Sequence, residues 1–285
     1  MKFYKLAAVA GALLMTGTLA GCAKTTNKED ILEEQNNEIF EELPREEVNP
    51  EIPETPEVPE IPAVTVPEEE PPKITTVSYI LVNADGVNIR SGAGTSYSAL
   101  GTAEKSTLYA YLGEENGFYK TNYKNRNVYI SKKYCSVYEM KKSDNEAIEA
   151  VIAEGAKCLG VPYVYGATRL HDGKGNMYKG FSTNAFDCSS LMQYMFYKGA
   201  DKLLDVNTRT QIYQGTTVAK SNLKRGDLIF FTNASRKNNT GIERVGHVAM
   251  YLGDNYILHT ASDYAKIEQI SNTRWGYYVQ TQRMI

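Results

Sequence analysis

The chain of 285 residues is poor in histidine and tryptophan, with three His and one Trp, and its formal net charge is only −3. A net charge so close to zero excludes a strongly basic nucleic-acid-binding protein. The four cysteines and three histidines form no CxxC or HxxxH pair, so a zinc site is a weak alternative for any of them. The apolar run at residues 6–14 is shorter than the ~20 residues that a membrane-spanning helix needs.

Proline is almost absent outside one segment. Nine of the ten prolines lie from Pro44 to Pro72, and the tenth is Pro162. Residues 23–73 also carry 16 acidic and four basic side chains, a net charge of −12. Such a composition cannot bury enough apolar surface to offset chain entropy, so it predicts a disordered spacer. Residues 74–285 carry 25 basic and 18 acidic side chains, and this charge split predicts an acidic stem followed by a mildly basic body.

The N-terminus has the pattern of an export signal. Lys2 and Lys5 precede the apolar run, and small residues lead to Leu19-Ala20-Gly21-Cys22. The last four residues resemble the bacterial lipobox, in which the signal is cut before a cysteine that is then acylated. The resemblance implies a signal peptide at residues 1–21 and, at residues 22–73, a lipidated Cys22 with the acidic linker. The protein would be anchored to the outer face of the cell membrane, or to the periplasmic side or outer membrane of a cell with two membranes. The alternative is an ordinary signal in which Cys22 has no role.

Residues 74–140 predict a small all-β domain, because short runs rich in Val, Ile and Tyr are separated by Gly, Asn and Ser. Four strings in this segment resemble a bacterial SH3 domain: VNIRSGAG at residues 87–94, LGT at 100–102, GFYK at 117–120 and VYI at 128–130. The resemblance implies a small SH3-like barrel of a kind that often contacts cell-wall material. The alternative is a barrel that only packs against the next domain.

A helix is predicted to follow the barrel. Ser143 and Glu146 have the spacing of a capping box, and Gly160 with Pro162 ends the helical pattern. Apolar residues at helical spacing predict one buried face, made of Ile148, Val151, Ile152, Gly155 and Leu159.

A second predicted helix begins at Cys188. Asp187 is a natural N-cap, and Gly199 is expected to end the helix. Cys188 would then lie in the first turn, where the positive end of the helix dipole lowers the pKa of a thiol and favours the nucleophilic thiolate. The alternative is a buried structural cysteine. Cys135 and Cys158 are expected either to form a disulfide or to remain two buried thiols.

Two of the three histidines lie in consecutive predicted strands. His247 lies in the string VGHVAMYLG, His259 ends the string NYILHT, and Gly253-Asp254 is a plausible hairpin turn between them. In neighbouring antiparallel strands the two imidazoles can lie side by side. One could then exchange a proton with the thiol and the leaving amine while the other orients it. A buried histidine without a catalytic role is the alternative for each.

With these strings in view, residues 146–285 resemble the NlpC/P60 cysteine peptidases, papain-like hydrolases of bacterial cell-wall peptides. The resemblance implies an α+β fold, with helices packed on an antiparallel sheet at residues 143–285, behind the small all-β SH3-like barrel. The matching strings are PYVYG (162–166), DCSSL (187–191), LKRGDLIFF (223–231), GHVAMYLG (246–253) and ILHTAS (257–262).

The resemblance also implies a catalytic triad. Cys188 would be the nucleophile, His247 the general base and acid, and His259 the orienting third member, with no metal or cofactor. The implied reaction is that of a cysteine endopeptidase cleaving the γ-D-glutamyl–diamino acid bond of peptidoglycan stem peptides or muropeptides. We expect a monomer that binds no nucleic acid. The alternatives are an inactive wall-binding protein, or an amidase or acyltransferase of the same superfamily.

Substrate-binding residues follow from the same resemblance. It implies that Asp187 and Ser189 help to bind the amino end of the peptide and that Tyr165 lies beside the cleft. For Tyr165 the alternative is core packing. The long segment at residues 167–186 is an expected loop insertion bordering the cleft, and its His171 is expected on the surface.

Overall fold

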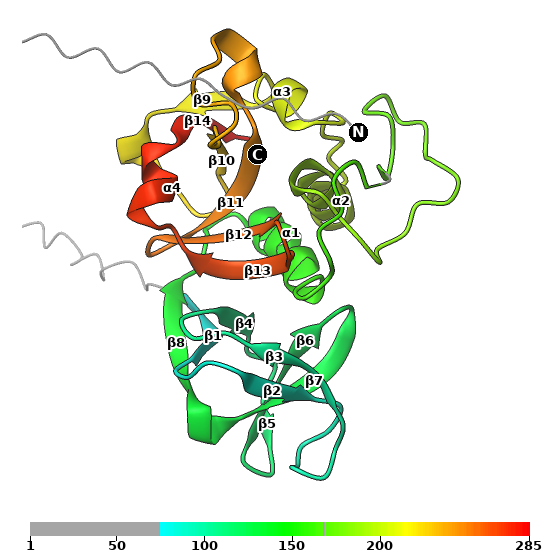
Figure 1. The fold of residues 1–285 in the computed structure, drawn as a ribbon, viewed down its shortest axis with the longest axis vertical. Coiled ribbons are helices and arrows are strands. Elements are labelled where there is room, and N and C mark those ends of the chain that lie inside the picture. Colours follow the sequence, from blue (N-terminus) through cyan, green and yellow to red (C-terminus); the bar gives the residue numbers. More distant parts are fainter. Residues whose placement is uncertain (1–74, 168) are drawn as a thin grey trace, which may run out of the picture. The chain divides into compact units, whose positions relative to one another are not determined.

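The structure of the protein is a computed structural model that describes residues 75–285 apart from residue 168 (Figure 1). The predicted signal segment, Cys22 and the acidic stem lie outside the described residues. The described residues belong to one compact unit. Within them, no helix is both long enough and apolar enough to span a membrane.

The N-terminal part is all-β, as the residue pattern predicts. The Val-Asn-Ile-Arg string forms a strand in which Val87 and Ile89 are buried while Asn88 and Arg90 point outward, which is the period-2 alternation of a strand with one face in the core. The strands are β1 (Thr76–Val82), β2 (Val87–Arg90), β3 (Ala99–Ala103), β4 (Leu108–Ala110), β5 (Glu114–Glu115), β6 (Phe118–Tyr123) and β7 (Arg126–Ser131), followed by the 3-10 turn η1 (Lys132–Tyr134) and β8 (Cys135–Lys141).

The first helix, α1 (Glu146–Lys157), begins later than the capping-box pattern predicts. Asn145 is its N-cap and accepts a hydrogen bond from the Ala147 N–H, whereas the Ser143 N–H donates to the Glu149 carboxylate. The prediction of its buried face is confirmed, and Leu159 is buried just beyond the helix end.

The second helix, α2 (Cys188–Ala200), confirms Asp187 as its N-cap but does not end at Gly199. The chain leaves the helix at Asp201, which adopts a left-handed conformation with φ 49°. Gly199 is needed for a different reason: a Cβ there would lie 2.4 Å from the Val151 backbone. It therefore allows α1 and α2 to pack closely against each other.

A nine-stranded antiparallel sheet combines three strands of the N-terminal part with six later strands, in the order β8-β1-β4-β13-β12-β11-β10-β14-β9. The other five strands form a second sheet, β3-β2-β7-β6-β5. The remaining elements are α3 (Thr208–Gln211), β9 (Thr216–Val218), η2 (Lys220–Asn222), β10 (Leu228–Phe231), η3 (Gly241–Arg244), β11 (His247–Gly253), β12 (Tyr256–Ala261), β13 (Tyr264–Gln269), α4 (Asn272–Gly276) and β14 (Tyr278–Arg283).

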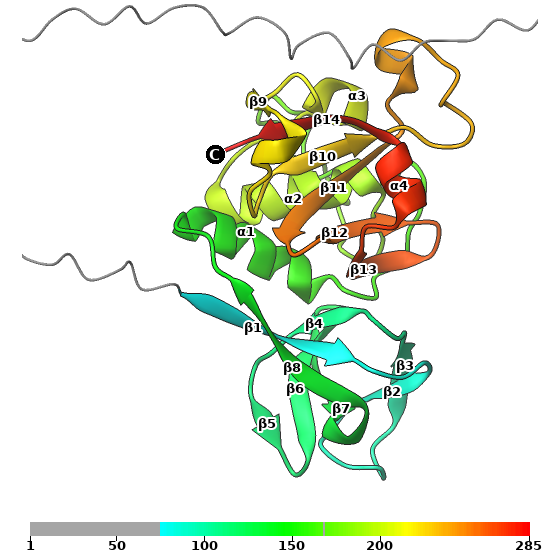
Figure 2. The ribbon, with the colours of Figure 1, turned by 90° about the vertical axis from the view of Figure 1, so that its left-hand side faces the viewer.

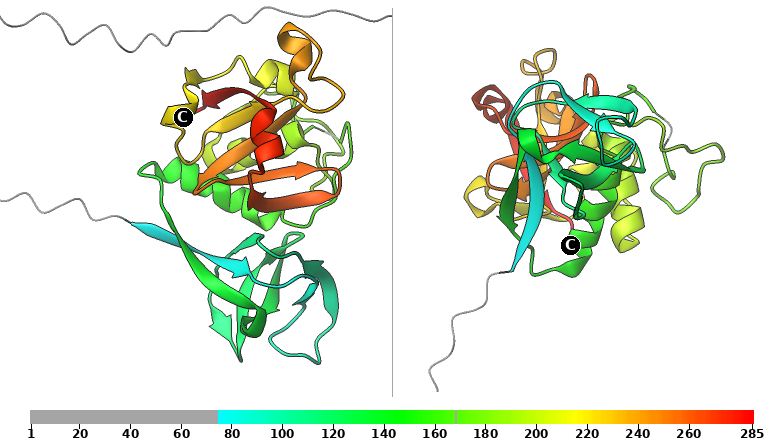
Figure 3. Two further views of the ribbon diagram at one scale, coloured as in Figure 1. Left: turned by 60° about the vertical axis from the view of Figure 1, so that its left-hand side comes forward. Right: turned by 90° about the horizontal axis from the view of Figure 1, so that it is seen from below.

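Both faces of the large sheet are covered. On one face α2 contacts β11 and β12, and Val248, Met250 and Leu258 belong to the core cluster that includes the helices (Figures 2 and 3). On the other face Trp275 and Tyr277 pack over a smaller cluster containing Ile229, Phe231, Ala249, Ile257 and Ile270. The architecture is α+β, with helices packed on an antiparallel sheet, as expected.

Arg225 ties three elements together from a buried position, its side chain being 6% exposed. Its guanidinium donates to both oxygens of Glu149 at 2.6 and 2.9 Å, to the Tyr79 hydroxyl at 2.7 Å and to the Leu252 carbonyl at 2.8 Å. These partners come from α1, β1 and β11. The ion pair and its hydrogen bonds therefore join the all-β part to the helices and the large sheet.

We expect Glu149→Gln to lower the free energy of unfolding by about 3–5 kcal/mol, because it leaves the buried Arg225 charge without a counter-charge. Chemical denaturation followed by circular dichroism measures this change. Glu146→Gln is the matched control: that carboxylate is 92% exposed and 3.9 Å from Lys142, so its loss should cost at most ~1 kcal/mol. Equal losses for the two variants would contradict a structural role for the Arg225 cluster.

Candidate active site

Cys188 is the first residue of α2, held there by a complete capping box. The Asp187 carboxylate accepts from the Ser190 N–H at 2.9 Å, and the Ser190 hydroxyl accepts from the Asp187 N–H at 2.9 Å. Cys188 lines one cavity together with Gly246 and His247, so the start of α2 and the start of β11 meet there.

His247 and His259 are brought together by the pairing of β11 with β12. Met250 lies opposite Leu258 and Tyr251 opposite Ile257, so the two histidines project from the same face of the sheet. Their imidazoles are joined by a hydrogen bond of 3.0 Å between His247 Nε2 and His259 Nδ1. The turn between the strands falls at Asp254-Asn255, both with positive φ, one residue later than predicted.

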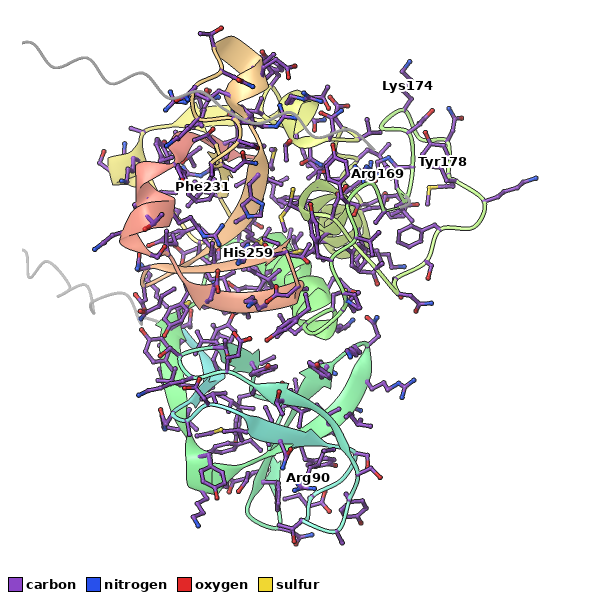
Figure 4. The ribbon with its side chains drawn as sticks, viewed as in Figure 1. Arg90, Arg169, Lys174, Tyr178, Phe231 and His259 are labelled. Carbon is purple, nitrogen blue, oxygen red and sulfur yellow. The ribbon has the colours of Figure 1, made fainter. Side chains whose placement is uncertain are left out.

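A carboxylate completes this chain of hydrogen bonds. His259 Nε2 lies 2.9 Å from Glu268 Oε1 on β13, and the same oxygen accepts from Arg274 Nη2 at 3.1 Å. Lys266 lies opposite His259 in the β12–β13 register, which places Glu268 diagonally across from His259 on the same face. Figure 4 labels His259, on β12, and Phe231, at the end of β10; both strands belong to the large sheet.

The hydrogen bonds assign the tautomers of both imidazoles. An ionised carboxylate can only accept, so His259 Nε2 carries a proton and His259 Nδ1 is an acceptor. His247 Nε2 must then donate to it, which leaves a lone pair on His247 Nδ1. Although burial alone raises the pKa of Glu268, the hydrogen bond from His259 and the nearby positive charges outweigh it and lower that pKa to about 2. Glu268 is therefore ionised at neutral pH.

Both imidazoles are neutral at neutral pH. Burial holds the pKa of His247 well below its ordinary value, and His259 and Arg274 lower it further. Burial also lowers the pKa of His259, although the hydrogen bond to Glu268 acts in the opposite direction. His247 Nδ1 is thus an unprotonated base.

The pKa of the Cys188 thiol is raised, whereas its place at the start of a helix predicted a lowered pKa. Burial raises the pKa of Cys188 to about 12, and the Asp187 carboxylate raises it further. The N–H groups of Val248 and Ser189, and the Arg169 guanidinium, lower this pKa but do not offset the desolvation. Cys188 is therefore a neutral thiol before substrate binds, and a base must take its proton before the sulfur can attack.

Two neighbouring cavities open on either side of Cys188. One, of about 370 Å³, is lined by His247 and Arg274 as well as Cys188. The other, of about 450 Å³, is lined by Asp187, Ser189 and Tyr165 as well as Cys188. Tyr165 is 83% exposed, so core packing is not its role. Six site residues were predicted within residues 74–285, and five of them line at least one of these cavities: Tyr165, Asp187, Cys188, Ser189 and His247. The sixth, His259, lines neither cavity and hydrogen-bonds to His247.

The Asp187 and Ser189 side chains form a hydrogen bond with each other. The Ser189 hydroxyl donates to Asp187 Oδ1 at 2.9 Å, and the Arg169 guanidinium pairs with Asp187 Oδ2 at 2.7 Å. Arg169 belongs to the insertion at residues 167–186, which thereby reaches the cavity, as expected. Figure 4 shows Arg169 close to α2, whereas Lys174 and Tyr178 lie on the outer part of the insertion.

His171 contradicts its expected surface position. It is fully buried, its Nδ1 accepts from the Gly173 N–H at 2.9 Å, and its ring lies against Tyr197. The insertion thus folds its histidine inward against α2. Burial lowers the pKa of His171, which keeps it neutral.

The structure decides between the two alternatives for Cys135 and Cys158, a disulfide or two buried thiols. Cys135 and Cys158 are buried free thiols, not a disulfide, and burial raises the pKa of each to about 12. In residues 75–285, residue 168 left aside, no group of three His, Cys, Asp or Glu side chains is arranged to hold a metal ion.

Sequence reasoning missed Glu268, Arg274 and Arg169. Glu268 alternates with apolar residues in the strand YAKIEQ, where a charged residue is typical of a solvent-facing position. Only the pairing of β12 with β13 places it beside His259. Arg169 and Arg274 carry no local motif.

Comparisons with known proteins agree with these features. Residues 160–284 match the model of the NlpC/P60 family, and residues 85–136 match that of the bacterial SH3 domain. The chain is 34% identical over 137 residues to Peptidoglycan endopeptidase RipA of Mycolicibacterium smegmatis, covering 47% of this chain and 25% of the relative. It is 30% identical over 163 residues to Gamma-DL-glutamyl hydrolase of Bacillus subtilis, covering 57% of this chain and 35% of the relative.

A solved NlpC/P60 family protein from Bacillus cereus aligns at 23% identity with a TM-score of 0.39, over 73% of this chain and 63% of that chain. The chain spans only 25% to 35% of the length of the two curated relatives. The matches to the two family models cover the residues that line the two cavities beside Cys188 and most of the all-β part. Residues 160–284 are therefore an NlpC/P60 family domain, preceded by a bacterial SH3 domain at residues 85–136.

Proposed function

We propose that this protein is a peptidoglycan hydrolase, a cysteine endopeptidase that cleaves the γ-D-glutamyl–diamino acid bond of stem peptides. The observation that carries the proposal is the chain from Glu268 through His259 to His247, which ends in a cavity that Cys188 also lines. The two relatives, named as an endopeptidase of peptidoglycan and a glutamyl hydrolase, support the substrate class.

The protonation states define the first chemical step. Because the pKa of Cys188 is raised by burial while that of His247 is lowered, thiol and imidazole are both neutral. His247 Nδ1 takes the thiol proton as the sulfur attacks the amide carbonyl carbon. The imidazolium that forms is stabilised through His259 by the Glu268 carboxylate, so the negative charge acts when positive charge develops.

The later steps use the same groups. The backbone N–H of Cys188, at the start of α2, is placed to stabilise the tetrahedral oxyanion. His247 returns its proton to the leaving amine, the carbon–nitrogen bond breaks, and an acyl-enzyme thioester remains. Water, deprotonated by His247, hydrolyses the thioester and restores the thiol.

The proposal places the enzyme outside the cytoplasmic membrane, where peptidoglycan lies. The acyl chains on Cys22 would hold it there, and the acidic stem would separate the enzyme from the lipid. More than one acyl chain gives stable anchoring, whereas a single chain is marginal.

We expect Cys188→Ala to lower the rate of muropeptide hydrolysis by at least ~10³-fold, because the nucleophile is lost. Digestion of purified muropeptides followed by mass spectrometry measures the rate and identifies the bond cut. Cys135→Ala, which removes a buried thiol that lines neither cavity, is the control and should retain activity. Equal activity in wild type and Cys188→Ala would overturn the enzyme assignment, and release of an intact stem peptide from the sugar would identify an amidase.

We expect Glu268→Gln and Arg274→Gln to shift the acidic limb of kcat/KM in opposite directions. The limb reports protonation of the histidine pair and lies below pH 6.5, because the pKa of His247 is lowered. Loss of the Glu268 charge destabilises the imidazolium, so the limb moves to lower pH. Loss of the Arg274 charge has the opposite sign and moves the limb to higher pH. The other groups facing the pair, Lys266 and Cys188, are unchanged in both variants.

Glu268→Gln should also lower kcat by ~10- to 100-fold, less than the ~10²–10⁴-fold contribution of a general base itself. Rates measured from pH 4.5 to 9 give both the limb and kcat. Shifts of the same sign in the two variants would show that Glu268 and Arg274 act only through packing.

We expect Cys22→Ser to move the protein from the membrane fraction to the soluble exported fraction, because no acyl chain can then be attached. Fractionation with immunoblotting measures this distribution. A Cys22→Ser protein that stays in the membrane fraction would disprove the lipid anchor.

A further inference from the structure

The Asp187 carboxylate has no capacity left for a substrate amine. Its Oδ1 accepts from the Ser189 hydroxyl and the Ser190 N–H, both at 2.9 Å. Its Oδ2 accepts from the Gly166 N–H at 3.2 Å and pairs with the Arg169 guanidinium at 2.7 Å. A carboxylate offers about four lone-pair sites, and four donors fill them here. The residue is also only 5% exposed.

Arg169 occupies the place that a substrate ammonium group would need beside Asp187. Its Nε donates to the Val206 carbonyl at 2.5 Å and its Nη1 to the Ala167 carbonyl at 2.7 Å. With Nη2 on Asp187, the guanidinium is held at three points, and its side chain is 19% exposed. A cation fixed in this way repels a second cation and cannot move aside without losing two hydrogen bonds and an ion pair.

Two further arginines line the same cavity. Arg209 and Arg236 share one carboxylate oxygen of Glu243, at 2.6 and 3.2 Å. Only Nη1 of each takes part in these contacts, so other N–H groups of both guanidiniums remain available to a ligand. Three guanidiniums therefore face two carboxylates, and the cavity has an excess of positive charge beside Cys188. We call Arg169, Arg209 and Arg236 the arginine subsite.

The position of His247 identifies which half of the substrate meets the arginine subsite. The leaving amine must lie near His247, which gives it a proton, and His247 lines the cavity on the Arg274 side. The cavity with the arginine subsite includes Cys188 but not His247. It therefore receives the acyl half of the substrate.

We propose that the arginine subsite binds a free carboxylate on the acyl half of the substrate and that the cleft does not require a free amino terminus. The inference rests on the proposed peptidase function and narrows its substrate class. A glutamate linked through its γ-carbonyl keeps its α-carboxylate free next to the scissile amide, and a guanidinium pairs well with such a group. The substrates are then γ-glutamyl peptides whose amino end can be blocked, as in stem peptides still joined to the glycan.

Three synthetic peptides test this proposal. They are L-Ala-γ-D-Glu-diamino acid, its N-acetylated form, and its form with the glutamate α-carboxylate converted to a carboxamide. The diamino acid is L-Lys or meso-diaminopimelate, whichever wild type cleaves faster. We expect N-acetylation to change kcat/KM by less than about threefold, and amidation to lower it by about tenfold or more, as for loss of a charged hydrogen bond.

Arginine variants show whether the preference comes from the subsite. Arg209→Gln and Arg236→Gln should each reduce the carboxylate-over-carboxamide preference by about threefold or more, mainly by slowing cleavage of the carboxylate peptide. Arg244→Gln is the matched control, because Arg244 is a neighbouring exposed arginine that does not line the cavity, and it should keep the wild-type preference. Calorimetric binding of the same peptides to Cys188→Ala gives the preference without catalysis.

The outcomes distinguish a failure of this proposal from a failure of the peptidase assignment. Equal rates for carboxylate and carboxamide would overturn the arginine subsite, and loss of cleavage on N-acetylation would overturn the claim that no free amino terminus is required. Both results leave the peptidase assignment in place. A preference unchanged in Arg209→Gln and Arg236→Gln would overturn the arginine subsite as well. If wild type and Cys188→Ala are equally inactive on all three peptides, the peptidase assignment fails and this inference fails with it.

Discussion

The site depends above all on the pairing register of β11, β12 and β13. Side chains alternate between the faces of a strand, so a shift of one residue would turn His259 or Glu268 into the opposite face of the sheet. The observed register places His247, His259 and Glu268 on one face, in hydrogen-bonding order. The apolar residues that alternate with them are packed against α2 on the other face. The hydrophobic core thus fixes the register, and the register aligns the groups of the candidate active site.

Burial gives these groups their chemistry. The same desolvation that raises the pKa of the Cys188 thiol lowers the pKa of the His247 imidazole, so both groups are neutral, as the proposed proton transfer between them requires. Glu268 is ionised because His259 and Arg274 donate to it. The Glu268 carboxylate, the one negative charge in this chain of hydrogen bonds, therefore lies two hydrogen bonds from His247. From there it orients the two imidazoles without carrying a proton itself.

Arginine side chains neutralise carboxylates at two other places in the fold. Arg225 neutralises Glu149 in the core and joins β1 to α1 and β11, while Arg169 neutralises Asp187 at the start of α2. The first contact supports the fold. The second contact determines which charges remain available to a ligand. Because all hydrogen-bonding sites of the Asp187 carboxylate are filled, the guanidiniums of the arginine subsite are the charged groups that face the acyl half of the cleft.

Much of this protein could be read from local sequence patterns. The all-β segment, the two helices, the cap at Asp187 and the two histidine strands follow from alternation, helical spacing and capping chemistry, which act over a few residues. Patterns also predicted the pairing of His247 with His259, because a short hairpin joins their strands. The start of α1 and the end of α2 were misplaced, since Asn145 competes with Ser143 as a cap and Gly199 serves helix packing instead of termination.

The tertiary structure alone decided the rest. Glu268 and Arg169 gain their partners from contacts between segments distant in sequence or from a strand register, and neither lies in a local motif. The pKa of Cys188 depends on total burial, which opposes the local helix effect and exceeds it. The sequence by itself singled out the candidate residues Cys188, His247 and His259. The packing of the chain decided their protonation states and the charge of the cleft around them, because desolvation and Coulomb interactions depend on distance in space and not on distance along the chain.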